Sequence, residues 1–337
     1  MKTIIQKLQD KTNLTPAEME KLMHSILSGK ESKEDLAAFL LAMRAKGPTV
    51  EEITVAARLM RRFGIKVATM HDVILDTCGT GGDCKGTFNI STVAAFVICG
   101  AKVVVAKHGN RSVSSRCGSA DLLEALGINL NCDQELLSEC LDEIGMAFLF
   151  AQKLHPAMKN VAAVRKELGG ETIFNLLGPL SNPAGATHQL MGVYHRELIL
   201  PMVKVLKNLG LQRAMVVHGK DGLDEVTTTG PTFAAEYDGD GIKEYEINPK
   251  EFKIGLARPE DLHCQDLKEN VRIAQDVLKG KPGPHRDIVV LNAACGLYVA
   301  GKAKTIAQGI ELANQSIDSG RAWDKLEALK EFSNALL

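Results

Sequence analysis

Aromatic residues and an excess of charge of either sign are scarce in this sequence. Phe, Trp and Tyr make up 4% of the 337 residues, with a single Trp, and 40 Lys and Arg face 41 Asp and Glu for a net charge of −1. Single-stranded nucleic acids are bound by aromatic stacking surfaces along a basic groove. The composition supplies little for either feature, so we predict no nucleic-acid partner.

Long hydrophobic runs and paired cysteines are also lacking. No apolar run approaches the length that spans a bilayer, and the segment from Met1 to Lys7 is too polar for a signal peptide. None of the eight cysteines forms a C-x-x-C pair, and no zinc-binding spacing stands out. We therefore expect reduced thiols, a cytoplasmic location and no membrane partner.

Glycine is concentrated in a short segment that reads Asp76-Thr-Cys-Gly-Thr-Gly-Gly-Asp-Cys-Lys-Gly-Thr-Phe-Asn-Ile-Ser-Thr92. It follows an apolar run at 73–75 and precedes a helix-like run at 92–99, so backbone N–H groups can approach an anion closely. The pattern is neither a Walker A nor a G-x-G-x-x-G motif. Asp83 beside a phosphate cradle indicates ribose hydroxyls or a metal ion. A tight strand-to-helix turn without a ligand is the alternative.

Two further loops follow short apolar runs that we predict to be strands. The run at 103–105 leads into the basic, hydroxyl-rich loop 107–116, and the run at 215–217 leads to the adjacent carboxylates Asp224 and Glu225. Loops at the carboxyl ends of strands in an open α/β sheet are where ligands bind. Magnesium takes one or two carboxylates together with substrate oxygens and waters. The three loops together favour a polyanion site with magnesium.

Six motifs, in the expected order over nearly the whole chain, resemble the signatures of the anthranilate phosphoribosyltransferase family. They are Gly79-Thr-Gly-Gly-Asp83, Asn89-Ile-Ser-Thr92, Lys107-His-Gly-Asn-Arg111, Gly118-Ser-Ala-Asp121, Asn175-Leu-Leu-Gly-Pro-Leu-Ser-Asn-Pro183 and Asp224-Glu225. The resemblance implies a Mg²⁺-dependent pentosyltransferase of tryptophan biosynthesis that transfers the phosphoribosyl group of phosphoribosyl pyrophosphate to the amine of anthranilate. It also implies the fold of the pyrimidine nucleoside phosphorylases and a homodimer with contacts in the N-terminal helices. One departure is Cys84, where the family often has glycine, which leaves the fine geometry of this loop open.

The same motifs imply roles for individual residues. Those implied to bind phosphoribosyl pyrophosphate are Gly79, Gly82, Asp83, Thr87, Asn89, Ile90, Ser91, Thr92, Lys107, His108, Gly109, Asn110, Arg111, Ser112, Val113, Ser114, Ser115 and Ser119. Those implied to contact anthranilate are Gly79, Asn110 and Arg165, and those implied to bind magnesium are Ser91, Asp224 and Glu225. The residues expected to be catalytic are Lys107, Asn110, Arg111 and Arg165.

The chemistry of these side chains fits the implied reaction. Lys107 and Arg111 can neutralise charge that develops on the departing pyrophosphate, and the planar Arg165 guanidinium can grip the anthranilate carboxylate. Without the resemblance, Arg165 would be interpreted as an exposed helix arginine. For His108 we favour a role in ordering the loop over a role in catalysis.

The pattern along the chain predicts an α/β protein in two parts. Helix caps at Thr15, Ser32 and Thr49 indicate three helices in a helical domain over residues 1–70, to which helices from about 157–180 can be added. Residues 71–337 are expected to form the phosphoribosyl-pyrophosphate-binding domain, a mostly parallel sheet flanked by helices. Strand-like runs occur near 73–75, 102–106, 146–150, 189–194, 213–218 and 232–237. The stretch 287–337 is mostly helical, with Gly296, Gly301 and Gly320 as expected interruptions.

Three other functions remain open on the residues alone. A nucleoside phosphorylase would share the fold but split a nucleoside with phosphate, whereas the Asp224–Glu225 pair and Arg165 favour a magnesium diphosphate and a carboxylate acceptor. A nucleic-acid-binding relative would need a basic groove and would lack the acidic pair. A purely structural protein would leave three ligand-like loops unexplained.

Overall fold

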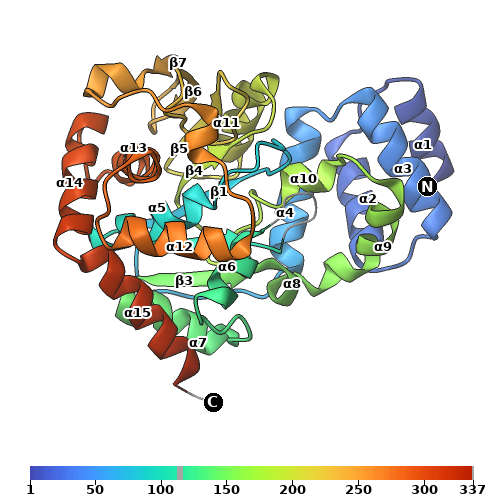
Figure 1. Ribbon diagram of the computed structural model, residues 1–337. Coiled ribbons are helices and arrows are strands. Elements are labelled where there is room, and N and C mark those ends of the chain that lie inside the picture. Colours follow the sequence, from blue (N-terminus) through green and yellow to red (C-terminus); the bar gives the residue numbers. More distant parts are fainter. Residues whose placement is uncertain (112–116, 336–337) are drawn as a thin grey trace.

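The computed structural model describes residues 1–111 and 117–335 and shows a helix-flanked sheet beside a group of N-terminal helices (Figure 1). The strands are Ile74–Gly79 (β1), Val104–Gly109 (β2), Met146–Phe150 (β3), His188–Gly192 (β4), Arg213–Gly219 (β5), Thr232–Tyr237 (β6) and Ile242–Ile247 (β7). The α-helices are Lys2–Gln9 (α1), Pro16–Leu27 (α2), Lys33–Lys46 (α3), Val50–Phe63 (α4), Ile90–Gly100 (α5), Ser119–Ala125 (α6), Gln134–Glu139 (α7), Ala151–Leu154 (α8), Lys159–Leu168 (α9), Ile173–Leu177 (α10), Ile199–Asn208 (α11), Leu267–Leu278 (α12), Pro284–Val299 (α13), Ile306–Asp318 (α14) and Arg321–Asn334 (α15).

The strands form one sheet in the order β3-β2-β1-β4-β5-β6-β7. The first five are parallel, and β6 pairs antiparallel with both β5 and β7, which confirms the predicted α/β class with a mostly parallel sheet. From β1, successive strands are added on one side as β2 and β3 and then on the other side as β4 to β7. The strand order therefore reverses beside β1. Crevices at such a reversal, beyond the carboxyl ends of the strands, are where ligands bind. Strand β7 was not predicted, because its sequence Ile-Lys-Glu-Tyr-Glu-Ile does not alternate between apolar and polar residues.

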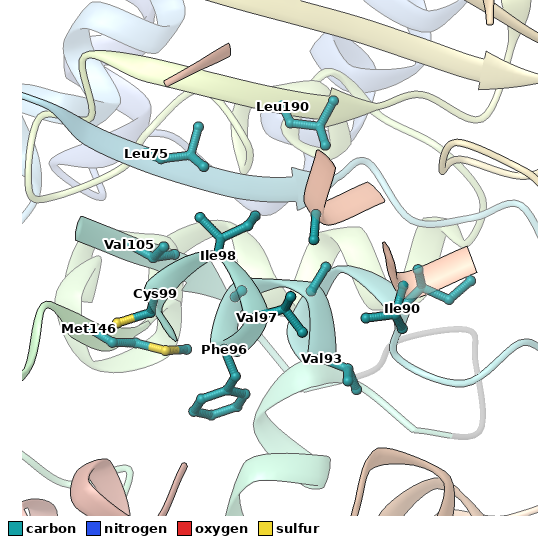
Figure 2. Close-up of a cluster of buried hydrophobic side chains, with 14 of the residues drawn as sticks. Leu75, Ile90, Val93, Phe96, Val97, Ile98, Cys99, Val105, Met146 and Leu190 are labelled. Atoms are coloured by element: carbon teal, nitrogen blue, oxygen red, sulfur yellow. The ribbon is translucent and has the colours of Figure 1, made fainter. Parts of the chain in front are cut away.

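Helix α5 forms the centre of the core on one face of the sheet (Figure 2). It is buried along nearly its whole length because α13 and α15 cover it on the side away from β1 and β2. The expected interruption at Gly296 is wrong, since α13 runs continuously through it. A Cβ atom on Gly296 would lie 2.5 Å from Cδ1 of Ile98 on α5, so glycine here serves close helix packing. Helix α11 covers the opposite face together with α4.

The N-terminal helices begin where the caps predict. The hydroxyl groups of Thr15, Ser32 and Thr49 each accept a hydrogen bond from the backbone N–H three residues later. The additional helix α1 was not predicted because no capping hydroxyl precedes it. Helices α9 and α10 pack against α2, α3 and α4, and their apolar residues join the same core. In the described part of the chain, no helix is long and apolar enough to cross a membrane.

The segment between β2 and β3 contains an irregular helical turn just before β3. Helix α7 ends at Glu139, and a π-helical turn, Cys140–Ile144, continues it to Gly145 in the left-handed conformation. The turn leads directly into β3, which pairs with β2 along Val105–Gly109. This pairing fixes one side of the strand that carries Lys107.

Candidate active site

The glycine-rich loop between β1 and α5 lies against the loop that carries Asp224. The backbone N–H of Gly81 donates to Asp224 Oδ2 at 2.9 Å, and a Cβ atom on Gly79 would lie 2.6 Å from the same oxygen. Gly82 has φ +87° and Cys84 has φ +54°, a region that favours glycine. Cys84 is therefore tolerated in a conformation that glycine adopts at lower cost, and the loop keeps its close approach to Asp224.

Ser91 contacts both β2, through Lys107, and the loop that carries Glu225. Its backbone N–H, in the first turn of α5, donates to Glu225 Oε1 at 3.1 Å, and its hydroxyl accepts from Lys107 Nζ at 3.3 Å. The Lys107 ammonium also donates to the carbonyl oxygen of Thr77, and the Lys107 side chain is 2% exposed. The fold thus brings together Ser91, Lys107, Asp224 and Glu225, which are far apart in the sequence.

The charges in this group strongly perturb one another. Burial raises the pKa of Asp224 well above its usual range, and the neighbouring Asp83 and Glu225 raise it further. Burial also raises the pKa of Glu225 to about 7, against the opposing effect of Lys107. Burial lowers the pKa of Lys107, while nearby carboxylates act in the other direction. Crowded carboxylates of this kind are relieved by an additional cation.

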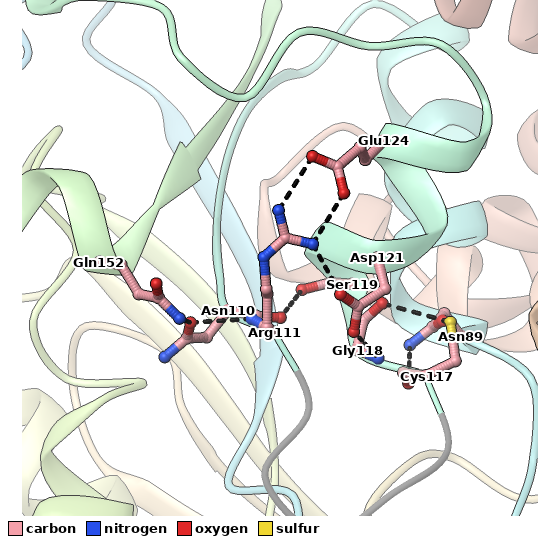
Figure 3. A network of polar contacts seen from close by, with 9 residues as sticks. All are labelled: Asn89, Asn110, Arg111, Cys117, Gly118, Ser119, Asp121, Glu124 and Gln152. Carbon is pink, nitrogen blue, oxygen red and sulfur yellow. Dashed lines mark hydrogen bonds and ion pairs between the residues drawn. The ribbon is translucent and has the colours of Figure 1, made fainter. Parts of the chain in front are cut away.

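The basic loop after β2 is organised around Arg111 (Figure 3). Its guanidinium makes a two-pronged ion pair with Glu124 at 2.8 and 2.9 Å and also pairs with Asp121 at 2.9 Å. The Asn110 carbonyl accepts from the Ser119 hydroxyl at 3.3 Å, and Gln152 donates to the Asn110 side chain at 3.1 Å. In this arrangement Arg111 faces acidic residues of α6. The predicted contacts at Ser112, Val113, Ser114 and Ser115 lie outside the described residues.

Gly109 ends β2 directly beside the start of α6. A Cβ atom on Gly109 would lie 2.3 Å from Oγ of Ser119 and 2.6 Å from the Phe148 ring. The position accepts no side chain without a shift, so Gly109 and Ser119 of the predicted set are in contact.

His108 is buried, and its tautomer follows from its contacts. The Nδ1 atom lies 3.0 Å from the carbonyl oxygen of Gly178, which can only accept, so Nδ1 carries the proton. The Nε2 atom is then an acceptor, and no described residue donates to it. Burial lowers the pKa of His108 to about 3, and the neighbouring His155 lowers it further, so the ring is neutral. The contact with Gly178 is compatible with the ordering role favoured from the sequence, which stays a prediction.

The remaining residues predicted to bind phosphoribosyl pyrophosphate surround the start of α5. Asn89 accepts from Asn270 Nδ2 at 2.9 Å and donates to the carbonyl of Cys117 at 3.4 Å, which links α5 to α12 and to the basic loop. Thr87 forms an isolated bridge with His263. Ile90 and Thr92 are each 1% exposed, and the Thr92 hydroxyl has no hydrogen-bond partner among the described residues.

Arg165 on α9 is half-buried rather than exposed. Its guanidinium lies 5.6 Å from the centre of the Phe174 ring and donates to Asn175 Oδ1 at 3.3 Å. Burial lowers the pKa of Arg165, and within the described residues it forms no ion pair. Among the described residues, no hydrogen bond or ion pair joins it to Gly79 or Asn110, the other predicted anthranilate contacts. Arg165 is therefore a cation available to an acidic ligand.

Four residues that support the site were not predicted. Asp76 lies in the glycine-rich segment directly after an apolar run, and Asn182 lies in the Asn175–Pro183 motif, so the sequence marked both positions, and the structure buries both. Gly192 and Asn270 carry no such signal, because only the fold places them beside Asp224 and Asn89.

Comparison with known proteins agrees with this geometry. The model of a glycosyl transferase family α/β domain matches residues 71–323, and the model of the helical bundle domain of the same family matches residues 2–64. The chain is 48% identical over 336 residues to the anthranilate phosphoribosyltransferase of Symbiobacterium thermophilum, covering 100% of this chain and 98% of the relative. It is 52% identical over 329 residues to that of Moorella thermoacetica, covering 98% and 97%. The chain belongs to the anthranilate phosphoribosyltransferase family.

Solved structures of this family have the same fold. The anthranilate phosphoribosyltransferase of Thermus thermophilus superposes with a TM-score of 0.93 at 41% identity, over 98% of this chain and 99% of that one. The Saccharomyces cerevisiae member in complex with phosphoribosyl pyrophosphate and Mg superposes with a TM-score of 0.91 at 29% identity, over 99% and 97%. The same yeast protein has been solved with 4-fluoroanthranilate, with a TM-score of 0.89 at 28% identity, over 99% and 97%.

Proposed function

We propose that this protein transfers the phosphoribosyl group of phosphoribosyl pyrophosphate to the amine of anthranilate, giving N-(5-phosphoribosyl)anthranilate and pyrophosphate in tryptophan biosynthesis. The observation that carries the proposal is the meeting of Lys107 with the Asp224–Glu225 pair at Ser91, at the start of α5. A buried cation, two carboxylates and a helix N-terminus suit a magnesium-bound diphosphate. Full-length similarity to enzymes of that name supports the same reaction.

The residues present fit magnesium. Among residues 1–111 and 117–335, no three His, Cys, Asp or Glu side chains form a metal site of their own. Magnesium is held by one or two carboxylates plus substrate phosphates, so Asp224 and Glu225 with the Ser91 hydroxyl are a sufficient protein contribution. Each carboxylate receives one backbone N–H, from Gly81 or Ser91, and can still use its second oxygen for the ion. Bound magnesium supplies positive charge that offsets the charge on the departing pyrophosphate.

The leaving group receives most of the assistance in this proposal. Anthranilate is a weak aromatic amine nucleophile, and the sugar passes through an oxocarbenium-like state as in glycoside chemistry. Lys107 stabilises the developing charge from its fixed position at Ser91. Arg111 contributes only when its guanidinium turns from Glu124 towards the diphosphate, with Asn110 beside it. The neutral His108 ring holds the loop and excludes water from this end of the sheet.

Arg165 would bind the other substrate. Its half-buried guanidinium has no acidic partner among the described residues, and it stacks over Phe174. A planar guanidinium pairs with a carboxylate through two parallel hydrogen bonds. We assign it to the anthranilate carboxylate, with Gly79 and Asn110 as further contacts.

The proposal includes three broader features. The boundary near residue 70, with α9 and α10 added to the helical part, is supported by the core that these helices share with α2, α3 and α4. A homodimer through the N-terminal helices would elute in gel filtration at twice the mass of 36.4 kDa. A cytoplasmic location would be checked by cell fractionation.

Loss of anthranilate fluorescence tests the reaction directly. The purified protein is mixed with anthranilate, phosphoribosyl pyrophosphate and Mg²⁺, and each component is omitted in turn. We expect the signal to fall only in the complete mixture. A complete mixture without turnover, together with cleavage of a pyrimidine nucleoside by phosphate, would instead assign the protein to the nucleoside phosphorylases.

A further inference from the structure

A buried carboxylate without an assigned role lies at the centre of the sheet. Asp76 on β1 is 0% exposed. Its Oδ1 atom accepts from the backbone N–H of His108 at 3.1 Å, and its Oδ2 atom accepts from Asn182 Nδ2 at 2.8 Å. Burying such a group is costly unless hydrogen bonds compensate for the lost hydration. Asp76 is therefore part of a specific polar arrangement rather than of the surrounding apolar core.

Asn182 extends this arrangement to a second backbone group. Its Nδ2 atom also donates to the carbonyl oxygen of Ala106 at 2.8 Å. Ala106 and His108 are the residues on either side of Lys107. The Asp76–Asn182 pair thus holds the β2 backbone both before and after Lys107.

The Asp76 and Asn182 side chains bind the β2 backbone just beyond the point where its pairing with β1 ends. The parallel pairing of β1 with β2 ends at Leu75 and Val105. Beyond that point no backbone pairing joins the two strands, and the Lys107 side chain reaches the Thr77 carbonyl and the Ser91 hydroxyl. Without the pair, the backbone around Lys107 would be hydrogen-bonded to the sheet from the β3 side only.

The loop that carries Asn182 is anchored from three other elements. Successive carbonyl oxygens at Gly178, Pro179 and Leu180 each lie in hydrogen-bond contact with a different side chain, those of His108, Gln189 and Arg61 at 3.0, 2.7 and 2.7 Å. These side chains come from β2, β4 and α4. Asn182 is therefore presented to Asp76 from a fixed position.

The charges of Asp76 and Lys107 agree with this arrangement of hydrogen bonds. Burial raises the pKa of Asp76 to about 6, while the Asn182 amide, the Lys107 ammonium and the His108 N–H oppose that rise. Lys107 in turn has Asp76 as the largest of the nearby carboxylate influences that counter the effect of its burial.

We infer that Asp76 and Asn182 form a positioning pair for the phosphoribosyl pyrophosphate site. The pair touches no substrate and acts by keeping the Lys107 ammonium at Ser91, beside Asp224 and Glu225. This inference rests on the proposed function, because its effect is measured as binding of the sugar diphosphate.

The Asp76→Asn variant tests the pair with little change in shape. The new amide places an NH₂ group against either the His108 N–H or the Asn182 NH₂, so one donor loses its acceptor. We expect the KM for phosphoribosyl pyrophosphate to rise at least about tenfold, the usual size for a lost hydrogen bond to a charged group. The KM for anthranilate should stay within about twofold, since Arg165 is held by other elements. A variant that is only less stable would lose kcat without this difference between the two substrates.

Glu236→Gln is the matched control. Glu236 is a buried carboxylate on β6 of the same sheet, bound by Arg213, Tyr245 and Tyr298, and its contacts do not include Lys107. The control should reduce thermal stability and leave both KM values unchanged. If Asp76→Asn does not fold, Asn182→Ala gives the same test, because it removes both Nδ2 contacts.

The outcomes separate the inference from the proposed function. An active wild-type protein whose Asp76→Asn and Asn182→Ala variants keep the wild-type KM for phosphoribosyl pyrophosphate would overturn the positioning pair and leave the function intact. A wild-type protein that turns over no phosphoribosyl pyrophosphate with anthranilate would overturn both.

Discussion

A Cβ atom on Gly192 would lie 1.6 Å from the backbone carbonyl oxygen of Asp224. Gly192 ends β4, and the chain that carries the acidic pair crosses directly over it. No rotation of a side chain can relieve this contact, because the oxygen is a backbone atom and the backbone fixes the position of a Cβ atom. The backbone at Asp224 can therefore occupy its position only because residue 192, on β4, has no side chain.

The first prediction concerns this crossing. Gly192→Ala should displace Asp224 and Glu225, lower kcat at least about tenfold and raise the Mg²⁺ concentration needed for half-maximal rate, since small misplacements of binding groups have large effects. Steady-state rates over a magnesium titration measure both quantities. Gly230→Ala is the control, because a Cβ atom there has no neighbour within 4 Å. Equal magnesium titrations for Gly192→Ala and wild type would contradict the prediction.

The second prediction tests the acidic pair itself. Asp224→Ala combined with Glu225→Ala should remove the protein ligands for magnesium, so the rate should fall by at least about tenfold and respond only weakly to added Mg²⁺. The double variant Glu327→Ala with Glu331→Ala removes the same charge from an exposed face of α15 and should titrate like wild type. A normal magnesium titration in the first double variant would exclude the pair from metal binding.

The third prediction concerns the acceptor substrate. Arg165→Ala should raise the KM for anthranilate about tenfold or more and lower kcat less, because a charged hydrogen-bonded pair with the carboxylate is lost. Arg165→Lys should recover only part of the loss, since an ammonium does not reproduce the two parallel hydrogen bonds. The neighbouring exposed Lys166, changed to Ala, controls for net charge. An unchanged KM in Arg165→Ala would remove this residue from the site.

The fourth prediction concerns pH and stability. Burial lowers the pKa of His155 from its usual 6.5 to about 4, so the folded protein keeps the ring neutral where the unfolded chain protonates it. The stability that this ring contributes is complete above pH 6.5 and is lost as the pH falls towards 4. At 1.36 kcal/mol per pKa unit the loss is about 3 kcal/mol.

Urea unfolding at several pH values measures this loss. His155→Gln should lose less stability than wild type between pH 7 and pH 4.5, although its stability at pH 7 is lower. Asp76 acts in the opposite direction, because its raised pKa favours the folded state as the pH falls below about 6. Asp76 is present in both wild type and His155→Gln, so the difference between their losses of stability reports on His155 alone. His24→Gln, at an exposed site, should follow wild type.

Local signals in the sequence were sufficient for much of the fold. Capping hydroxyls at Thr15, Ser32 and Thr49 predicted α2, α3 and α4 because a cap is a contact over three residues. The parallel strands followed from short apolar runs between helical segments. Helix α1 was missed because it lacks such a cap, and the expected break at Gly296 was wrong because a distant residue, Ile98, decides that position.

The sequence alone determined which chemical groups this protein has: a glycine-rich loop, a basic loop and an adjacent pair of acids, each placed after a strand. Only the tertiary structure decided how they act together. Lys107 reaches Ser91 just beyond the end of the β1–β2 pairing, where Asp76 and Asn182 hydrogen-bond to the β2 backbone, while Arg111 is held by Glu124. Such contacts join residues that are far apart in the chain, and their geometry depends on strand order and register, which local patterns do not encode.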